Sequence, residues 1–332
     1  MSYTRLGTVR RLVGAIGISA LVLALAGCGG SGLPEFSKAT QAASQSSDHV
    51  TVGDPPVRLA VNDVGEGRPV VFLHGLGTNS YTWHRILPAL AERYRVITID
   101  LKGFGASEKP LEGDYTVRAQ ADLVKEVIAR KQLRDVTLVG HSYGGGISLL
   151  LALDDKKAQR KRISRLVLLD SIAYPQTTPL FFDLIQLPVI GDLSVSMIPP
   201  EVQIEQALRL AYEQESAVTK EAIAQYSAPL HTAGGKHAII ETVRHIVPDN
   251  IETIARQYPE ITVPTLVVWC DQDRVVPVAL GRQLAENMPH AGLQIVRGCG
   301  HAPQEEKPET TLEIIAAHLR GDHDDQLGAK TN

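Results

Sequence analysis

The stretch from Asp135 to Gly146, with the sequence DVTLVGHSYGGG, constrains the fold of this chain more than any other segment. Its first part, Asp135 to Val139, is a short apolar run with β-branched residues, which is typical of a buried strand. A G-x-S-x-G pattern follows, and the apolar run from Ile147 to Leu153 predicts a helix. Strand, pattern and helix in this order predict a sharp turn that exposes the Ser142 hydroxyl in a strained backbone conformation.

The glycines of this turn have a steric purpose. Gly140 and Gly144 stand two residues before and after the serine, where the turn brings the chain too close to itself for side chains. The backbone N–H groups after the serine lie at a helix N-terminus, where they can stabilise developing negative charge. Gly144 to Gly146 lacks the G-x-G-x-x-G pattern or a P-loop lysine, so close helix–strand packing explains it better than phosphate binding. Taken alone, the pattern also occurs by chance as a glycine-rich turn.

Predicted strands alternate with predicted helices along most of the chain, which indicates an α/β fold with a mostly parallel, doubly wound sheet. Val57 to Val64 is expected to be a first, antiparallel strand. The further strands are expected at Val70–Leu73, Val96–Ile99, Leu166–Leu169, Leu266–Trp269 and Leu293–Val296. Helices are expected at Tyr81–Arg93, Thr116–Lys131 and Glu309–Leu319. This core is assigned to residues 51–171 and 262–320.

Between the two parts of the core, residues 172–261 are predicted to form an inserted helical cap. Its candidate helices are Val202–Glu215, Thr219–Tyr226 and Lys236–Val247, separated by Pro and Gly. Phe181 and Phe182 lie in an unusually apolar run. We expect them either to pack the cap on the core or to form an apolar wall of a substrate pocket.

The N-terminus has the pattern of a processing signal. Arg5, Arg10 and Arg11 precede an uncharged, largely apolar run that ends in small residues before Cys28. Leu25-Ala26-Gly27-Cys28 resembles the bacterial lipobox, which implies cleavage after residue 27 and a lipid on Cys28 that anchors the protein to a membrane of the cell envelope. The outer membrane or the periplasmic face is favoured over the cytoplasm; an ordinary secretory signal is the alternative. Residues 28–50 are predicted to be a flexible tether, and residues 321–332 a disordered tail.

The chain also contains a serine, an acid and a histidine in an order that suits nucleophilic catalysis. Ser142, Asp273 and His301 each follow a predicted parallel strand, and the carboxyl ends of such strands share one edge of the sheet. Histidine can take the serine proton at neutral pH, and a carboxylate can orient the imidazole. Asp271 and Asp170 are alternative acids.

Other polar residues are given supporting or no catalytic roles. His74 and His141 are expected to support turns near the site rather than to transfer protons. His318, His323, Asp324 and Asp325 could suggest a metal, but they occupy a helix end and a loose tail, so no metal is predicted. A net charge of −4 gives no basic field, which argues against a nucleic-acid partner.

These motifs together resemble the α/β-hydrolase superfamily, in particular its cap-bearing serine hydrolases. The resemblance spans about Val57 to Leu319 and rests on the following residues: His74-Gly75-Leu76-Gly77, Asp100-x-x-Gly103-x-Gly105-x-Ser107, Gly140 to Gly144, Asp273 to Pro277, and Gly300-His301. It implies that Asp273 is the acid, that the backbone N–H groups of Leu76 and Tyr143 form the oxyanion hole, and that no cofactor is needed. It also implies hydrolysis of a small, apolar carboxylic ester through an acyl-enzyme on Ser142.

Two other functions stay open. A C–C bond hydrolase of diketo acids uses the same triad but would need positive groups for the substrate carboxylate, and a non-catalytic binding protein could share the fold.

Trp269-Cys270 departs from the Trp-Gly usual in relatives. Because Cys270 and Cys299 precede the acid and the histidine on expected neighbouring strands, we predict a disulfide between them, with two separate buried thiols as the alternative.

Overall fold

The structure, a computed structural model, describes residues 48–176, 185–187 and 190–322, all within one compact unit of residues 37–332. The predicted signal segment, Cys28, Phe181 and Phe182 therefore lie outside the described residues, as do His323, Asp324 and Asp325. The lipid anchor and the role of the two phenylalanines stay predictions. Within the described ranges, no helix combines the length and apolar character that crossing a membrane requires.

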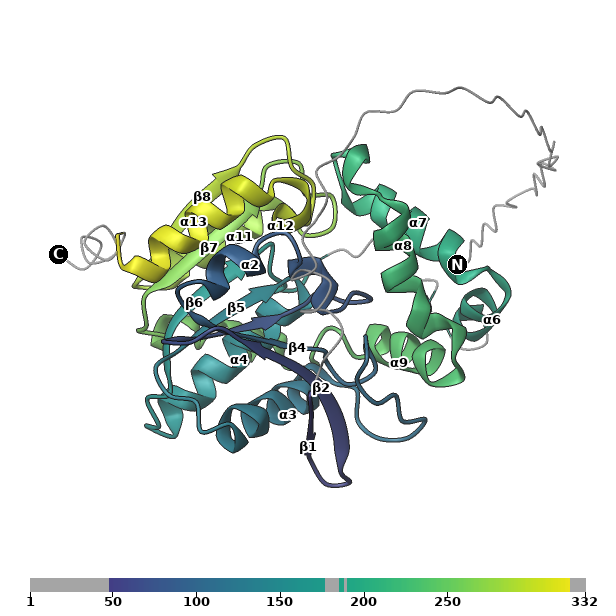
Figure 1. Cartoon of the computed structure of the whole chain (residues 1–332), viewed down its shortest axis with the longest axis horizontal. Helices are drawn as coiled ribbons and strands as arrows, with labels where there is room; N and C mark the ends of the chain where they lie inside the picture. Colours follow the sequence, from purple (N-terminus) through teal and green to yellow (C-terminus); the bar gives the residue numbers. More distant parts are fainter. Residues whose placement is uncertain (1–47, 177–184, 188–189, 323–332) are drawn as a thin grey trace, which may run out of the picture. The chain divides into compact units, whose positions relative to one another are not determined.

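An eight-stranded, mostly parallel sheet forms the centre of the protein (Figure 1), which confirms the predicted fold class. The strand order is β1-β2-β4-β3-β5-β6-β7-β8; the β1–β2 and β2–β4 pairs are antiparallel, and the other pairs are parallel. The strands are β1 (Asp48–Val52), β2 (Val57–Val64), β3 (Pro69–Leu73), β4 (Arg95–Ile99), β5 (Val136–His141), β6 (Ile163–Leu169), β7 (Thr265–Cys270) and β8 (Ala291–Val296).

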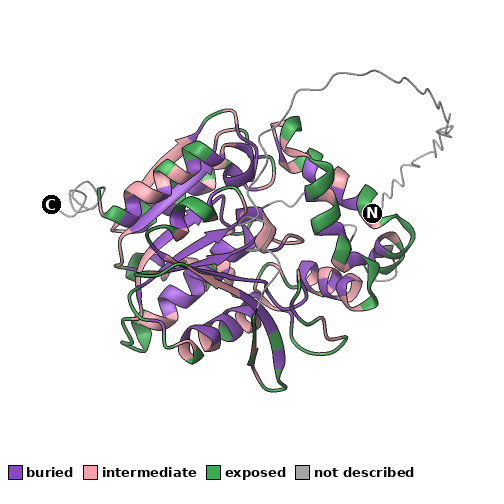
Figure 2. Cartoon of the chain, in the orientation of Figure 1, coloured by how far each residue is buried: buried purple, intermediate pink, exposed green. Residues whose placement is uncertain are grey.

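Both faces of the sheet are covered because its central strands are apolar on both sides, and Figure 2 shows these strands as buried. In β3, for example, Val71 and Leu73 belong to one core cluster while Val70 and Phe72 belong to the other. The first cluster is completed by α3 (Val117–Arg130), α4 (Tyr143–Lys157) and α11 (Val278–Asn287). The second is completed by η1 (Ser80–Trp83), α2 (Leu87–Ala91) and α13 (Pro308–Arg320).

Two local predictions were wrong. The helix expected over Tyr81 to Arg93 is divided into η1 and α2, since Pro88 has no N–H to continue a helix and fits only a first turn. The predicted tether ends too late, because residues 48–50 already belong to β1. This strand pairs with β2 from Asp48↔Val61 to Val52↔Val57. Without β1, the outer backbone groups of β2 would have no strand to pair with.

The regular elements that the structure describes between β6 and β7 are all helices. They are α6 (Ile190–Met197), α7 (Pro200–Ala211), η2 (Glu215–Ala217), α8 (Lys220–Ser227), η3 (Ala228–His231), α9 (Ala233–Arg244), α10 (Ile251–Ala255) and η4 (Tyr258–Glu260). Ile204, Leu208 and Tyr226 form a small core of their own, joined by Ala302 from the loop after β8. This segment, called the cap below, thus shares apolar contacts with the carboxyl end of the sheet.

Candidate active site

Ser142 occupies the sharp turn between β5 and α4. Its φ of 51° and ψ of −113° lie outside the regions that most L-residues favour, so the turn is strained. The surrounding backbone holds it there: its N–H donates to the Leu169 carbonyl at 2.9 Å, and its carbonyl accepts from Gly145 and Ile172 at 3.0 and 3.2 Å. Ser142 is 7% exposed, and that exposure faces a pocket.

The two glycines of the turn are required by contacts of different kinds. A Cβ on Gly140 would lie 2.4 Å from the carbonyl oxygen of Gly144, so these two residues do crowd each other. A Cβ on Gly144 would instead lie 2.2 Å from the carbonyl oxygen of Leu73 at the end of β3. The glycine at position 144 therefore lets the first turn of α4 pack on the neighbouring strand.

Asp273 and His301 come from the loops after β7 and β8. His301 Nδ1 donates to Asp273 Oδ2 at 2.8 Å, and the other oxygen, Oδ1, accepts from the N–H groups of Val275 and Val276 at 2.7 and 2.9 Å. The Asp273 side chain is fully buried. Because Nδ1 carries the proton, Nε2 of a neutral His301 keeps its lone pair and can act as a base.

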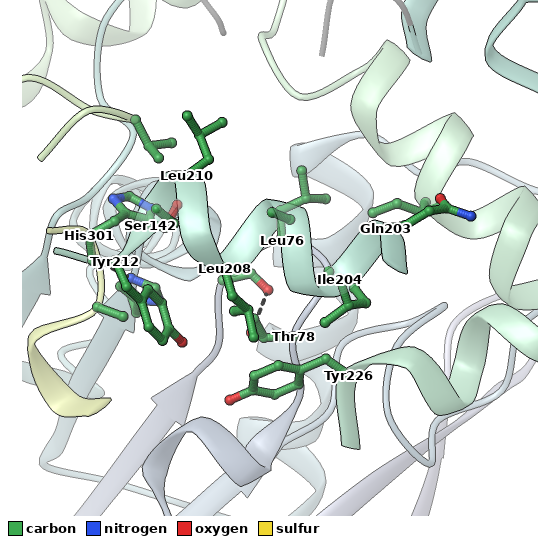
Figure 3. Close-up of a pocket in the computed structure, with 18 of the residues that line it drawn as sticks. Leu76, Thr78, Ser142, Gln203, Ile204, Leu208, Leu210, Tyr212, Tyr226 and His301 are labelled. Carbon is green, nitrogen blue, oxygen red and sulfur yellow. Dashed lines mark hydrogen bonds between the residues drawn. The ribbon is translucent and has the colours of Figure 1, made fainter. Parts of the chain in front are cut away.

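Ser142 and His301 line the same pocket and lie next to each other in Figure 3. No hydrogen bond joins the two side chains in the described part of the structure. Such bonds commonly tighten when substrate binds, and the adjacent placement suits transfer of the serine proton to the imidazole.

The alternative histidines are held by backbone groups. His141 Nε2 donates to the His301 carbonyl at 2.8 Å, and burial together with nearby His301 lowers the pKa of His141 to about 3. His74 Nε2 accepts from the Leu101 N–H at 3.0 Å, its Nδ1 donates to the Gly75 carbonyl, and burial lowers its pKa. Both stay neutral at physiological pH, and each bridges two loops of the site.

The alternative acids differ in their distance from the reaction. Asp271 Oδ1 accepts from the Gly298 N–H at 2.8 Å and makes no bond to His301. Asp170 directly follows β6, is fully buried, and has a carboxyl oxygen within 4.8 Å of a carboxyl oxygen of Asp273 and of a ring nitrogen of His301. The imidazole nevertheless bonds to Asp273.

The pocket above Ser142 is largely apolar and has walls from core and cap (Figure 3). Leu76 and the first turn of α4, which begins at Tyr143, flank Ser142 on the core side, where the predicted oxyanion donors are expected. The cap contributes mainly aliphatic side chains: Val195, Ile204, Leu208, Leu210, Leu230, Ile239 and Ile246. No lysine or arginine is among the described residues that line it.

Comparison with known proteins agrees with this geometry. The family model described as "Alpha/beta hydrolase family" matches residues 70–314, more than half of the chain. The chain belongs to the alpha/beta hydrolase family.

The relatives of this alpha/beta hydrolase are named for different activities. It is 29% identical over 252 residues to the uncharacterized hydrolase YugF of Bacillus subtilis, covering 76% of this chain and 89% of the relative. It is 30% identical to Lipase 3 of a Moraxella species, covering 81% and 82% of the two chains. It is 28% identical to a 2-hydroxymuconate semialdehyde hydrolase of a Pseudomonas species, covering 79% and 90%.

Among solved structures, an alpha/beta hydrolase fold protein from Burkholderia ambifaria superposes on this hydrolase with a TM-score of 0.70. The sequence identity is 25%, and the match covers 81% of this chain and 99% of that one. Together, the relatives establish hydrolase chemistry on this fold and leave the bond that is cleaved to be argued from the pocket.

Cys270 and Cys299 form a disulfide in this hydrolase, with their Cα atoms 4.9 Å apart. The bond joins the last residue of β7 to the loop after β8, two residues before His301. Two groups of described residues have the composition of a metal site: Cys270, Cys299 and Glu306, and Asp170, Asp273 and His301. In the first group, the disulfide occupies both cysteine sulfur atoms. In the second group, the hydrogen bond from His301 Nδ1 to Asp273 occupies a nitrogen and an oxygen that a metal would need.

Two buried glutamates on α12 (Pro303–Glu306) were missed from the sequence. Glu306 accepts from the N–H groups of Gly300, His301 and Ala302 at 3.0 to 3.1 Å, and from those of Glu213 and Gln214 in the cap at 2.8 and 3.0 Å. The carboxylate therefore orders the histidine loop and ties it to the cap. A run of two glutamates on a short helix has no pattern that distinguishes it from a solvated face.

The other glutamate, Glu305, lies at the pocket wall. Its Oε1 accepts from Thr82 of the core at 2.6 Å and from Tyr226 of the cap at 2.8 Å. Burial raises its pKa, while the hydrogen bonds from the hydroxyl groups lower it in part. Glu305 is the only acidic side chain among the described residues that line the pocket.

Proposed function

We propose that this hydrolase cleaves neutral carboxylic esters with an apolar acyl or alcohol part. The observation that carries the proposal is the apolar pocket directly above Ser142 and His301. In the proposed mechanism, His301 Nε2 takes the serine proton as Ser142 Oγ attacks the ester carbonyl, and the N–H groups of Leu76 and Tyr143 stabilise the oxyanion. Protonated His301 then gives its proton to the leaving alcohol, and water releases the acid.

The charge of the pocket favours esters over diketo acids. A diketo acid would bring a carboxylate into a pocket whose described lining offers no lysine or arginine and places Glu305 at the wall. Burying that charge without a partner is costly, whereas a neutral ester loses only apolar surface to the pocket. Similarity to Lipase 3 of the Moraxella species supports the same choice, and similarity to the 2-hydroxymuconate semialdehyde hydrolase supports the competing one.

A serine-directed probe tests the nucleophile. We expect a fluorophosphonate to label the wild-type protein and Ser164→Ala, a serine variant outside the pocket, but not Ser142→Ala. Loss of the nucleophile should reduce ester hydrolysis by at least about 10³-fold. Equal labelling of all three proteins, or of none, would reject Ser142 as the nucleophile.

A matched pair of substrates tests the charge argument. Hydrolysis of p-nitrophenyl butyrate is compared with that of the p-nitrophenyl monoester of succinic acid, which ends in a carboxylate. We expect kcat/KM to be at least about tenfold higher for the neutral ester. Preference for the charged ester, or release of products from a diketo acid, would favour the C–C hydrolase.

A further inference from the structure

Asp170 is a buried carboxyl group that the proposed mechanism does not use. It directly follows β6 with a φ of 44°, which is uncommon for residues other than glycine, and it is 0% exposed. Its Oδ1 accepts from the Cys270 N–H at 2.9 Å, whereas its Oδ2 is buried without any hydrogen-bond partner. A carboxylate oxygen in that position would lose its hydration without compensation.

Two polar groups of the active site lie directly beside it. The carboxyl oxygens of Asp170 and Asp273 and a ring nitrogen of His301 all lie within 4.8 Å of one another. Asp273 already accepts three hydrogen bonds, from His301, Val275 and Val276, while Asp170 accepts one. The two carboxyl groups are therefore close together but unequally solvated by the protein.

This inequality decides which carboxyl group is ionised. Two buried carboxylates at such a distance repel each other strongly, so one of them keeps its proton. The negative charge is most stable on Asp273, where three donors converge. The proton then belongs on Asp170, and on Oδ2 it would convert an unpaired acceptor into a donor.

We propose that Asp170 is a neutral carboxylic acid that donates a hydrogen bond to the Asp273 carboxylate and thereby positions Asp273 for His301. Asp170 is then a positioning residue, because it acts on the reaction only through Asp273. Its neutral state is independent of the activity, and only its effect on catalysis rests on the proposed function.

The local electrostatics agree with this arrangement. Burial raises the pKa of Asp170 well above its usual range, the neighbouring Asp273 raises it further, and Glu306 acts in the same direction. The hydrogen bond from the Cys270 N–H opposes them. The titratable groups that face Asp170 are thus Asp273 from the loop after β7, Glu306 from α12, and His301 from the loop after β8.

Infrared difference spectroscopy on the full chain tests the proton directly. At pH 7, we expect the wild type to show the carbonyl band of a protonated carboxylic acid, with one component missing in Asp170→Asn. Asp122→Asn, which removes a half-exposed carboxyl of α3, is the control and keeps the whole band. An unchanged band in Asp170→Asn would overturn the proposal.

Unfolding at different pH values provides a second readout. Because the folded-state pKa of Asp170 is raised, its contribution to stability is present below about pH 4 and is lost as the pH rises toward that pKa. Asparagine does not titrate. Relative to that of the wild type, the unfolding equilibrium constant of Asp170→Asn should therefore fall by up to about tenfold per pH unit above about pH 4, which means that the variant becomes relatively more stable. A difference independent of pH would also overturn the proposal.

Activity then separates positioning from packing. Asp170→Asn keeps a donor for Asp273 and should retain kcat within about tenfold of the wild type. Asp170→Leu has the same branched shape, with bulkier methyl groups in place of the oxygens, but no donor, and its kcat should fall at least tenfold further, with KM changed little, when measured on equally folded protein. Equal kcat in the two variants would reject the positioning role. If no ester is hydrolysed at all, the proposed function fails, while the spectra and unfolding still decide the protonation state.

Discussion

At the scale of single residues, the site depends on carboxyl groups that are solvated by backbone N–H groups rather than by water. Asp273 accepts from two such groups and Glu306 from five, and both are buried. Each carboxylate fixes a loop that has no secondary structure to hold it. Five donors converge on Glu306 in particular, so a substitution there should be felt at His301, whose N–H is one of them.

Glu306→Gln is predicted to be destabilising although the two side chains have the same shape. Glutamine replaces one acceptor oxygen by an NH₂ donor, so either the Gly300–Ala302 turn or the Glu213–Gln214 turn loses its partner. We expect a loss of about 1–3 kcal/mol in the free energy of unfolding, measured by urea titration, and a lower kcat. Glu309→Gln, at an 82% exposed side chain one turn further on, is the control and should change stability by less than about 0.5 kcal/mol.

At the scale of elements, three strand ends of the parallel sheet deliver the groups proposed to react, and a disulfide and a hydrogen bond connect neighbouring strand ends. β5 delivers Ser142, β7 and β8 precede the loops of Asp273 and His301, and the Cys270–Cys299 disulfide joins the last two strands. The Asp170 carboxyl adds a bond from β6 to the Cys270 N–H. The geometry of the site is therefore a property of neighbouring strands.

Removing the disulfide with the double variant Cys270→Ala/Cys299→Ala should lower the free energy of unfolding. The bond closes a loop with a sequence separation of 29, for which chain entropy predicts about 3–4 kcal/mol. Thermal unfolding followed by circular dichroism measures the loss. Cys28→Ala, which leaves the bonded pair intact, is the control. A double variant as stable as this control would show that the bond adds nothing to the fold.

At the scale of the whole molecule, the chemistry and the choice of substrate belong to different parts of the chain. The groups proposed to react come from loops of the sheet, whereas α7 and its neighbours supply most of the aliphatic wall around the substrate. Hydrogen bonds through Glu305 and Glu306 connect these parts. A substitution in the cap can therefore change the preferred substrate while the reacting groups stay in place.

Leu208→Trp is predicted to shorten the preferred acyl chain, since Leu208 is buried at the pocket wall and tryptophan would fill part of the space above Ser142. Across a series of p-nitrophenyl esters, kcat/KM should fall at least tenfold for the longer chains and much less for the acetate. Val202→Trp, on the exposed surface of the same helix, should leave the profile unchanged. A uniform loss for all chain lengths in Leu208→Trp would instead indicate misfolding.

Sequence alone predicted the features that depend on local chain chemistry. An apolar strand followed by glycines at fixed spacing can be satisfied by few backbone conformations, so the turn at Ser142 was predictable, as were the parallel sheet and the loops of Asp273 and His301. The limits of elements were less predictable, because Pro88 divided the segment predicted as one helix and the largely polar composition of residues 48–50 hid the start of β1.

Tertiary contacts determined the remainder, because they bring together residues that no spacing relates. Glu306 meets Glu213 and Gln214 only after the cap has packed on the core, and the sequence around Glu306 has no feature that distinguishes it from an exposed acid. The choice between Asp170 and Asp273 is of the same kind. Both follow strands, and what separates their roles is the number of N–H groups that the folded chain aims at each carboxyl group.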